Sequence, residues 1–132
     1  MAQVTRSILL NAPLRDVWAL ISPFQALPDW HPAVACSLRD DRGGVEHRKL
    51  RLKDGAEIVE KLLGSDGHSV GYSIVSSPLP VADYRAVLSG FEWNGATFVT
   101  WVSTFEKTAE NADEIIAGVY ESGLAALKKR FG

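Results

Sequence analysis

The stretch Asn111–Phe131, NADEIIAGVYESGLAALKKRF, decides the fold, because it is the only segment long enough to form a helix that covers a sheet. Its apolar side chains recur every three or four residues, while Glu114 and Glu121 fall on the opposite side, as in an amphipathic helix. Most of the chain before it is strand-like. A curved sheet wrapped around one helix, with no second layer to fill it, tends to keep an internal space.

The ends and the centre of this helix carry separate signals. Asn111 with Glu114 resembles a capping box, and the basic cluster Lys128–Arg130 suits a helix C-terminus, where cations interact favourably with the helix dipole. Gly123 falls near the middle of the apolar arc, where glycine costs about 1 kcal/mol relative to alanine. Either a strand approaches closely at Gly123, or the missing side chain enlarges a ligand space.

Composition limits the classes of protein to which the chain can belong. Its 132 residues, 46% of them hydrophobic, suit a single domain that spans residues 1–132. Charged residues make up 23% and the formal net charge is -2, so no strong field attracts nucleic acid or anionic membranes. No nucleic-acid partner is therefore expected.

The setting of the protein follows from its cysteine count and its N-terminus. The single cysteine, Cys36, cannot form an internal disulfide, which favours a reducing, cytoplasmic location. Residues Met1 to Leu10 lack the pattern of a signal peptide, and no stretch approaches the roughly 18 apolar residues of a membrane span. Stable membrane insertion is not expected. His47 and His68 have no metal-site spacing with each other or with Cys36, so we expect no metal and no other cofactor.

The expected elements follow from turn residues and apolar spacing. The sequence predicts a strand at 4–10, a helix from 13 to 22 and a short helical turn that closes at Trp30. Six further strands are expected at about 34–39, 45–53, 56–63, 69–76, 81–92 and 97–106, before the final helix. The fold class is therefore α+β, with a seven-stranded antiparallel curved sheet, a long C-terminal helix and two short helices between the first two strands.

The Asn94-Gly95 dipeptide is the preferred two-residue turn of a hairpin, and it assigns the faces of its two strands. Residues directly opposite each other in an antiparallel pair share a face. The concave face is expected to carry Tyr84, Ala86, Leu88, Gly90, Val99, Trp101, Ser103 and Phe105. The convex face is expected to carry Arg85, Val87, Ser89, Phe91, Thr100, Val102 and Thr104.

Three aromatic side chains fall on the convex face near this hairpin tip: Phe91, Trp93 and Phe98. Single surface aromatics are ordinary, but three together suggest a contact site, most simply a homodimer. Alternatively, the short helices or the loop Ser77–Pro80 cover them.

An earlier hairpin distinguishes two registers. A two-residue loop at Asp54-Gly55 leaves neither face apolar. A three-residue loop that starts at Lys53, with Gly55 left-handed in a bulge, instead gathers the charged side chains on the outer face. This register sets Arg48 directly opposite Glu60 on the inner face.

A set of dispersed residues resembles the START-like, helix-grip superfamily, and in particular the bacterial polyketide cyclase/dehydrase and lipid transport (SRPBCC) family. The resemblance spans nearly the whole chain and contains no single diagnostic motif. The residues that carry it are Ala12-Pro13, Val17-Trp18, Trp30-His31-Pro32, Gly55, Glu60, Leu62, Tyr72, Tyr84, Trp101, Phe105, Tyr120 and Gly123-Leu124.

The resemblance implies a sheet that grips the C-terminal helix around a pocket for lipids, polyketides, hormones or aromatic compounds. Plant abscisic-acid receptors are relatives in which a pocket lysine anchors the carboxylate of the ligand, and Val34 is similar in position here. Their gating loop is similar in position to the Lys53–Gly55 turn, and their latch to Ser77–Pro80.

Glu60 is the main candidate for polar chemistry, because a carboxylate that faces an apolar cavity must be paired or change its pKa. A structural ion pair with Arg48, contact with a ligand hydroxyl or amine, and general base catalysis are the three alternatives. Arg48 can equally bind an anionic group of a ligand.

His31 is the second catalytic candidate, and with Trp30 it follows the short helix beside the expected pocket entrance. A structural histidine is the alternative. The complete set of candidate ligand-binding residues is Trp30, His31, Arg48, Leu50, Ile58, Glu60, Leu62, Tyr72, Tyr84, Leu88, Trp101, Ile116, Val119, Tyr120 and Gly123. We also expect Ile74, Val99 and Leu127 on the inner side.

Three functions fit these observations. The first is binding or carriage of a small hydrophobic or aromatic molecule, lipid-like or polyketide-like, in an internal cavity. The second is a polyketide cyclase or dehydratase that acts on a ligand in the same cavity. The third is a stress or regulatory module that acts through a partner. No Gly-x-Ser-x-Gly elbow or phosphate-binding loop is present, which favours binding.

Overall fold

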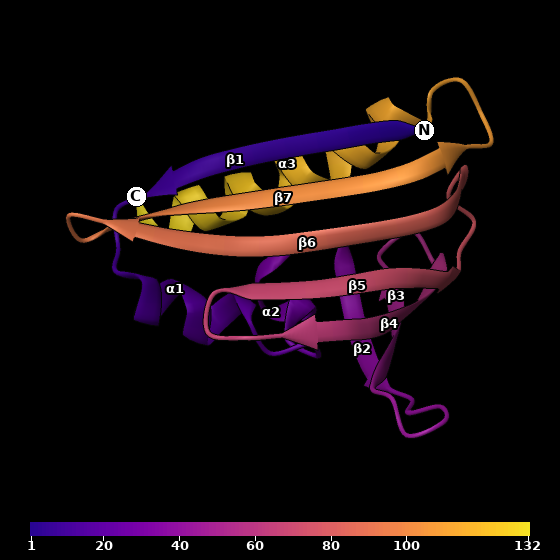
Figure 1. Ribbon diagram of the computed structural model, residues 1–132, viewed down its shortest axis with the longest axis horizontal. Helices are drawn as coiled ribbons and strands as arrows, with labels where there is room; N and C mark the ends of the chain where they lie inside the picture. Colours follow the sequence, from indigo (N-terminus) through magenta and orange to yellow (C-terminus); the bar gives the residue numbers. More distant parts are fainter.

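The computed structural model describes residues 1–132 and contains seven strands and three helices (Figure 1). The strands are β1 (Ala2–Leu10), β2 (Val34–Arg39), β3 (His47–Leu52), β4 (Glu57–Ser65), β5 (Ser69–Ser76), β6 (Val81–Trp93) and β7 (Ala96–Lys107). The helices are α1 (Leu14–Ile21), α2 (Leu27–Trp30) and α3 (Ala112–Phe131). The expected elements are all present, and their bounds agree with the expected ranges to within two residues.

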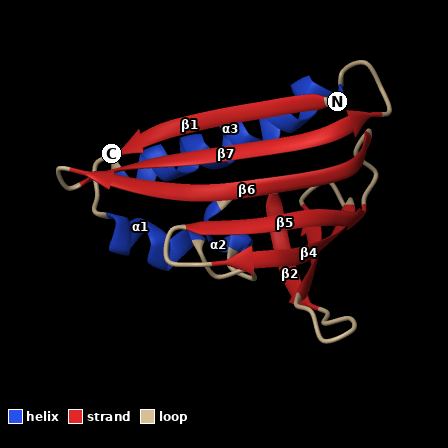
Figure 2. Cartoon of the chain, in the orientation of Figure 1, coloured by secondary structure: helices blue, strands red, loops and turns tan.

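All seven strands form one antiparallel sheet in the order β1-β7-β6-β5-β4-β3-β2. The sheet curves around α3, which runs along β1 and β7, while α1 contacts β6 and β7 and α2 contacts β2 (Figures 1 and 2). This is the α+β helix-grip architecture expected from the sequence. None of the three helices is long and apolar enough to cross a lipid bilayer.

Both hairpin registers are confirmed. Arg48 pairs with Glu60 across β3 and β4, and Gly55 has a φ of 93°, as the three-residue loop requires. Across the Asn94-Gly95 turn, Leu88 pairs with Trp101 and lies inside. The pairing is interrupted only between Ala82 and Arg85, so Tyr84 has no direct backbone partner.

The core lies between the concave face of the sheet and the buried side of α3. All the side chains expected on the concave face of β6 and β7 are buried, because both strands alternate regularly along this stretch. The side of α3 that faces them buries Ile116, Tyr120, Leu124 and Leu127. The concave face of the sheet and the buried side of α3 thus face each other across one apolar core.

The expected capping box at the start of α3 is wrong. Asn111 has a φ of -90° and a ψ of 13°, and its side chain makes no capping hydrogen bond. A side-chain cap needs an extended backbone at this position, and Asn111 does not have it. Asp113 and Glu114 in the first turn instead interact favourably with the helix dipole.

Candidate functional site

An apolar cavity of about 70 Å³ lies between the sheet and α3. Its walls come from α2 and the segment after it, from the six strands β2 to β7, from the loop between β5 and β6, and from α3. The lining residues are Leu27, His31, Ala33, Val34, Leu50, Leu52, Ile58, Glu60, Tyr72, Ile74, Leu79, Tyr84, Trp101, Ile116, Val119 and Tyr120.

The structure brings most of the candidate ligand-binding residues to this cavity. Those that line it are His31, Leu50, Ile58, Glu60, Tyr72, Tyr84, Trp101, Ile116, Val119 and Tyr120. The candidates that do not line it are Trp30, Arg48, Leu62, Leu88 and Gly123. Trp30, Arg48 and Leu88 instead surround a neighbouring space of about 10 Å³.

Five lining residues were not among the candidates: Leu27, Ala33, Val34, Leu52 and Leu79. Of these, Leu52 lies on the face that the three-residue register places inside. Most lie in or beside irregular segments, where the period of a strand or helix no longer indicates which way a side chain points. Val34 had a signal, because it is similar in position to the pocket lysine of the hormone receptors. Its inward position is consistent with that match.

Arg48 and Glu60 form a buried ion pair beside the cavity. Both residues are 6% exposed. Nε of Arg48 donates to Oε1 of Glu60 at 2.7 Å, and Nη2 lies 2.7 Å from the same oxygen. Nη1 donates to the carbonyl oxygen of Phe24 at 2.7 Å, and the guanidinium lies over the Phe24 ring at 4.0 Å. Arg48 is therefore held from several sides by the protein itself.

Glu60 keeps one oxygen free for other partners. Only Oε1 takes part in the contacts with Arg48, and Glu60 is the only carboxylate that lines the cavity. Burial raises the pKa of this carboxyl, because desolvation outweighs the attraction of Arg48. Oε2 can accept a hydrogen bond from a ligand, and the carboxyl can exchange a proton at a higher pH than an exposed glutamate.

Three phenol groups form a chain in the same wall. Trp101 Nε1 donates to the Tyr72 hydroxyl at 2.9 Å, the Tyr72 and Tyr84 hydroxyls are 3.3 Å apart, and the Tyr84 hydroxyl contacts that of Tyr120. Burial raises the pKa of Tyr120 to about 12, and it raises those of Tyr72 and Tyr84 well above the ordinary value of 10.0. All three phenols are therefore neutral near pH 7 and keep their protons.

The three tyrosine hydroxyls together have one more proton than their contacts with each other use. Each neutral phenol carries one proton, and the two contacts between the hydroxyls use two of the three. Tyr72 cannot donate to Trp101, because the indole nitrogen is itself the donor. One phenol proton therefore remains for an acceptor outside the three phenols.

His31 has both ring nitrogens occupied by backbone groups. Nε2 donates to the carbonyl oxygen of Val119 at 2.8 Å, and Nδ1 accepts from the backbone N–H of Ala33 at 3.2 Å. Burial lowers the pKa of His31, so the neutral ring that these two bonds require is favoured. No nitrogen is left to take a proton from a ligand, and this geometry favours a structural role.

The same ring explains Gly123. A Cβ atom at this position would lie 2.7 Å from Cδ2 of His31 and 3.1 Å from Cζ3 of Trp101. Glycine is thus required by two side chains rather than by the backbone of a strand, and His31 occupies the space that a ligand would otherwise gain. Trp30 packs against Trp101, with ring centroids 5.7 Å apart, and its Nε1 is buried without a hydrogen-bond partner.

The chain has no cluster of three or more His, Cys, Asp or Glu side chains that can hold a metal ion. Cys36 is half-buried and free. The chemistry of the site therefore rests on one carboxyl and three phenols in an apolar wall.

The chain belongs to the polyketide cyclase / dehydrase and lipid transport family, whose model matches residues 1–132. It is similar to the protein XoxI from Bacillus cereus, with 33% identity over 99% of this chain and 96% of that one, and a TM-score of 0.92. No curated protein matches the sequence.

More distant solved structures share the fold alone. The Zhui aromatase/cyclase from Streptomyces has 15% identity and a TM-score of 0.79, over 98% of this chain and 92% of that one. A START superfamily protein from Mycobacterium smegmatis has 13% identity and a TM-score of 0.76, over 98% and 96% of the two chains. The helix-grip assignment made from the sequence is confirmed by these matches.

Proposed function

We propose that this protein binds and carries a small hydrophobic or aromatic molecule, lipid-like or polyketide-like, in the cavity between the sheet and α3. The observation that carries this proposal is an almost entirely apolar cavity with a single carboxylate, Glu60, in its wall. Ligand sites of this kind combine an apolar lining with a few well-placed polar groups. Membership of the family supports the same function.

The volume of the cavity constrains how a ligand binds. An apolar cavity of about 150 Å³ holds benzene, whereas this cavity measures about 70 Å³. The site is therefore in a closed form and must enlarge around its ligand. Leu52, Ile74, Leu79 and Val119 are the partly buried side chains of the wall, and they are the ones that can move.

The polar groups select the ligand. Oε2 of Glu60 accepts a hydrogen bond from a ligand hydroxyl or amine, and the remaining phenol proton donates to a ligand oxygen. A ligand that satisfies both groups avoids the cost of leaving them unpaired in an apolar space. We therefore favour an aromatic or alicyclic compound that carries at least one hydroxyl group.

A second candidate function is cyclisation or dehydration of a polyketide-like substrate in the same cavity. The observation that favours it is the raised pKa of Glu60, since a carboxyl that titrates nearer to neutral pH is a better general acid or base. Glu60 would take or return the proton at the reacting carbon or oxygen. His31 is the weaker candidate, because both of its nitrogens are occupied.

Native mass spectrometry of the protein purified from its own host tests the binding proposal. We expect a copurifying molecule whose mass is lost on denaturation and regained on reconstitution. A protein that carries no such mass, and that also fails to bind any member of a panel of phenols, naphthols and hydroxylated polycyclic compounds, would contradict it. Conversion of the bound compound during incubation would instead favour the enzyme.

We place the protein in the cytoplasm on the basis of its single cysteine, which suits a reducing compartment.

We also propose that it forms a homodimer through an aromatic row on the convex face. Phe91, Trp93 and Phe98 are 62%, 66% and 45% exposed, and the 44% exposed Leu9 continues the row on β1. No other element covers these side chains.

A further inference from the structure

The sheet opens between β5 and β6. Their pairing runs over five residue pairs, from Ser69 with Ser89 to Ser73 with Arg85, and then stops. Both strands continue beyond this point, β5 to Ser76 and β6 back to Val81. In Figure 1 their ribbons diverge toward the loop that joins them.

Each free segment is held by its other neighbour, so the opening is built into the sheet. Ile74 and Ser76 of β5 pair with β4, while Val81 and Ala82 of β6 pair with β7. A bulge follows Ala82, and Asp83 has a φ of 52°, a left-handed conformation that costs a non-glycine residue about 1 kcal/mol or more.

The loop between the two strands prevents them from closing. Its sequence, Ser77-Pro78-Leu79-Pro80, contains two prolines, which lack the N–H that a closing hairpin ladder needs. The backbone N–H of Thr108 donates to the carbonyl oxygen of Pro80 at 2.9 Å and so holds this end of the loop on the β7 side. The gap therefore stays open at its base.

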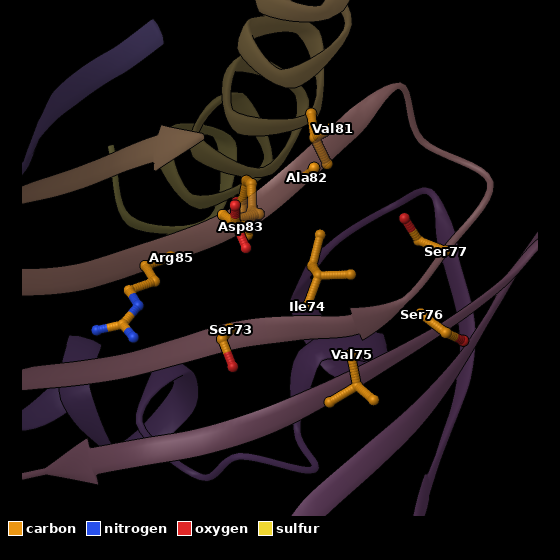
Figure 3. A pocket seen from close by; sticks show the side chains of 10 residues that line it. Ser73, Ile74, Val75, Ser76, Ser77, Val81, Ala82, Asp83 and Arg85 are labelled. Atoms are coloured by element: carbon orange, nitrogen blue, oxygen red, sulfur yellow. The ribbon is translucent and has the colours of Figure 1, made fainter. Parts of the chain in front are cut away.

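A cleft of about 590 Å³ occupies this gap (Figure 3). Serine, aspartate and arginine side chains lie on its outer rim, among them Ser73, Asp83 and Arg85. Two residues, Ile74 and Tyr84, line both this cleft and the internal cavity. In Figure 3, Ile74 projects from β5 into the gap.

Of these two side chains, only Ile74 is free to move. Tyr84 is 4% exposed, its hydroxyl contacts those of Tyr72 and Tyr120, and its ring stacks on Phe105 at 6.0 Å. Ile74 is half-buried and makes no side-chain hydrogen bond. Rotation of its side chain breaks only dispersion contacts, which are individually weak.

We propose that the ligand enters and leaves the internal cavity through the sheet, between β5 and β6, with Ile74 as the side chain that closes the passage. This inference rests on the proposed function. On this route the ligand first occupies the large cleft on the outer face and then enters the small cavity. It can therefore be taken up without separating α3 from the sheet.

The test blocks the passage after folding. In a Cys36→Ser background, Ile74→Cys is treated with benzyl methanethiosulfonate, which attaches a benzylthio group that dithiothreitol removes. The control is Val87→Cys in the same background. Val87 is 40% exposed on the outer face of β6, and it does not line the cleft. The probe is N-phenyl-1-naphthylamine, whose fluorescence rises in an apolar site, and its binding and release are followed by stopped flow.

We expect the benzyl adduct at position 74 to slow association by at least about tenfold, as for other binding steps that wait for an opening. Reagent added to the preloaded Ile74→Cys protein should slow release of the probe similarly, and dithiothreitol should restore both rates. The adduct at position 87 should change neither. Ile74→Ala provides a second variant, in which both rates should rise.

Three outcomes would overturn the inference. Equal rates with and without the adduct at position 74 would exclude this passage, while binding to the unblocked protein would leave the proposed function intact. Faster release with a weaker affinity would show that the adduct merely competes for the cavity. Absence of probe binding to every form would remove the proposed function as well.

Discussion

Arg48 and Glu60 face each other across β3 and β4, and Arg48 occupies only one of the two oxygens of the Glu60 carboxylate. Within the pair, Arg48 has a structural role, whereas Glu60 also lines the cavity. The Arg48 side is closed by Phe24, whose carbonyl oxygen and ring both contact the guanidinium. The Glu60 side remains available to a ligand.

The two partners should not be equivalent when one is removed. Glu60→Gln leaves a buried arginine that cannot lose its proton, so we expect it to be the more costly of the two single changes at the same pH. Arg48→Met should cost less, because Glu60 can then become neutral by taking a proton. Urea unfolding of both variants and of the double variant checks this order, and equal losses would contradict it.

Glu60 should also impose a pH dependence on stability. Its pKa is raised above the ordinary value of 4.5, so the folded state holds this proton more tightly than the unfolded chain does. Its contribution to stability is greatest below pH 4.5 and is lost as the pH rises through the raised folded value. The difference in unfolding free energy between wild type and Glu60→Gln should therefore fall over that window. A difference that grows with pH would contradict the assignment.

His31 should act in the opposite direction. Its pKa lies below the ordinary value of 6.5, because burial outweighs the bond to Val119. As the pH falls below 6.5 the unfolded chain takes up a proton that the folded protein refuses, so stability is lost down to the folded pKa. His31→Gln, which does not titrate, should lack this loss in thermal or urea unfolding between pH 7 and pH 5. An identical slope in the variant would contradict the prediction.

Two glycines of α3 should respond differently to alanine. A Cβ at Gly123 would lie 2.7 Å from the His31 ring, which is held by hydrogen bonds at both nitrogens, so Gly123→Ala should destabilise by about 1 to 3 kcal/mol. A Cβ at Gly118 meets nothing within 4 Å. Gly118→Ala is the matched control, and it should stabilise by about 0.5 to 1 kcal/mol through helix propensity alone. The same sign for both would refute the steric reason for Gly123.

The aromatic row on the convex face should determine the oligomeric state. Phe98 pairs directly with Phe91 on one side and with Leu9 on the other, so the row crosses three strands. We expect wild type to sediment as a dimer at high micromolar concentration and Trp93→Ala to weaken the dimer by about tenfold or more. Leu38→Ala, at a 61% exposed position on β2, is the control. Monomers in both wild type and Trp93→Ala would remove the dimer.

The sheet and its registers could be predicted from local sequence because turn residues and alternation act at short range. Gly55 and Asn94-Gly95 determine the two hairpin loops, and the loop length then decides which residues face each other. The opposition of Arg48 and Glu60 follows from this alone. The helix cap failed because the conformation of Asn111 depends on the turn before it, which the capping pattern does not describe.

The details of the site depend on contacts between segments far apart in the sequence. His31 lies against Gly123, and Tyr84 contacts Tyr120, so the volume and the proton count of the cavity appear only when α2, β6 and α3 are packed together. The cleft had no local signal, because aspartate tolerates the left-handed conformation of Asp83 without a glycine to mark it.

Because β5 and β6 pair over only a short stretch, the molecule consists of two parts, here called plates. They are joined along this stretch, here called the seam. One plate consists of β1, β7, β6 and α3, and the other of β2 to β5 with α2. The cavity lies between them, and the polar contacts that cross it include Trp101 with Tyr72 and His31 with Val119. We expect a small change of the angle between the plates to change the cavity volume while each plate keeps its own backbone hydrogen bonds, so that the stiffness of the seam would limit the size of a bound molecule.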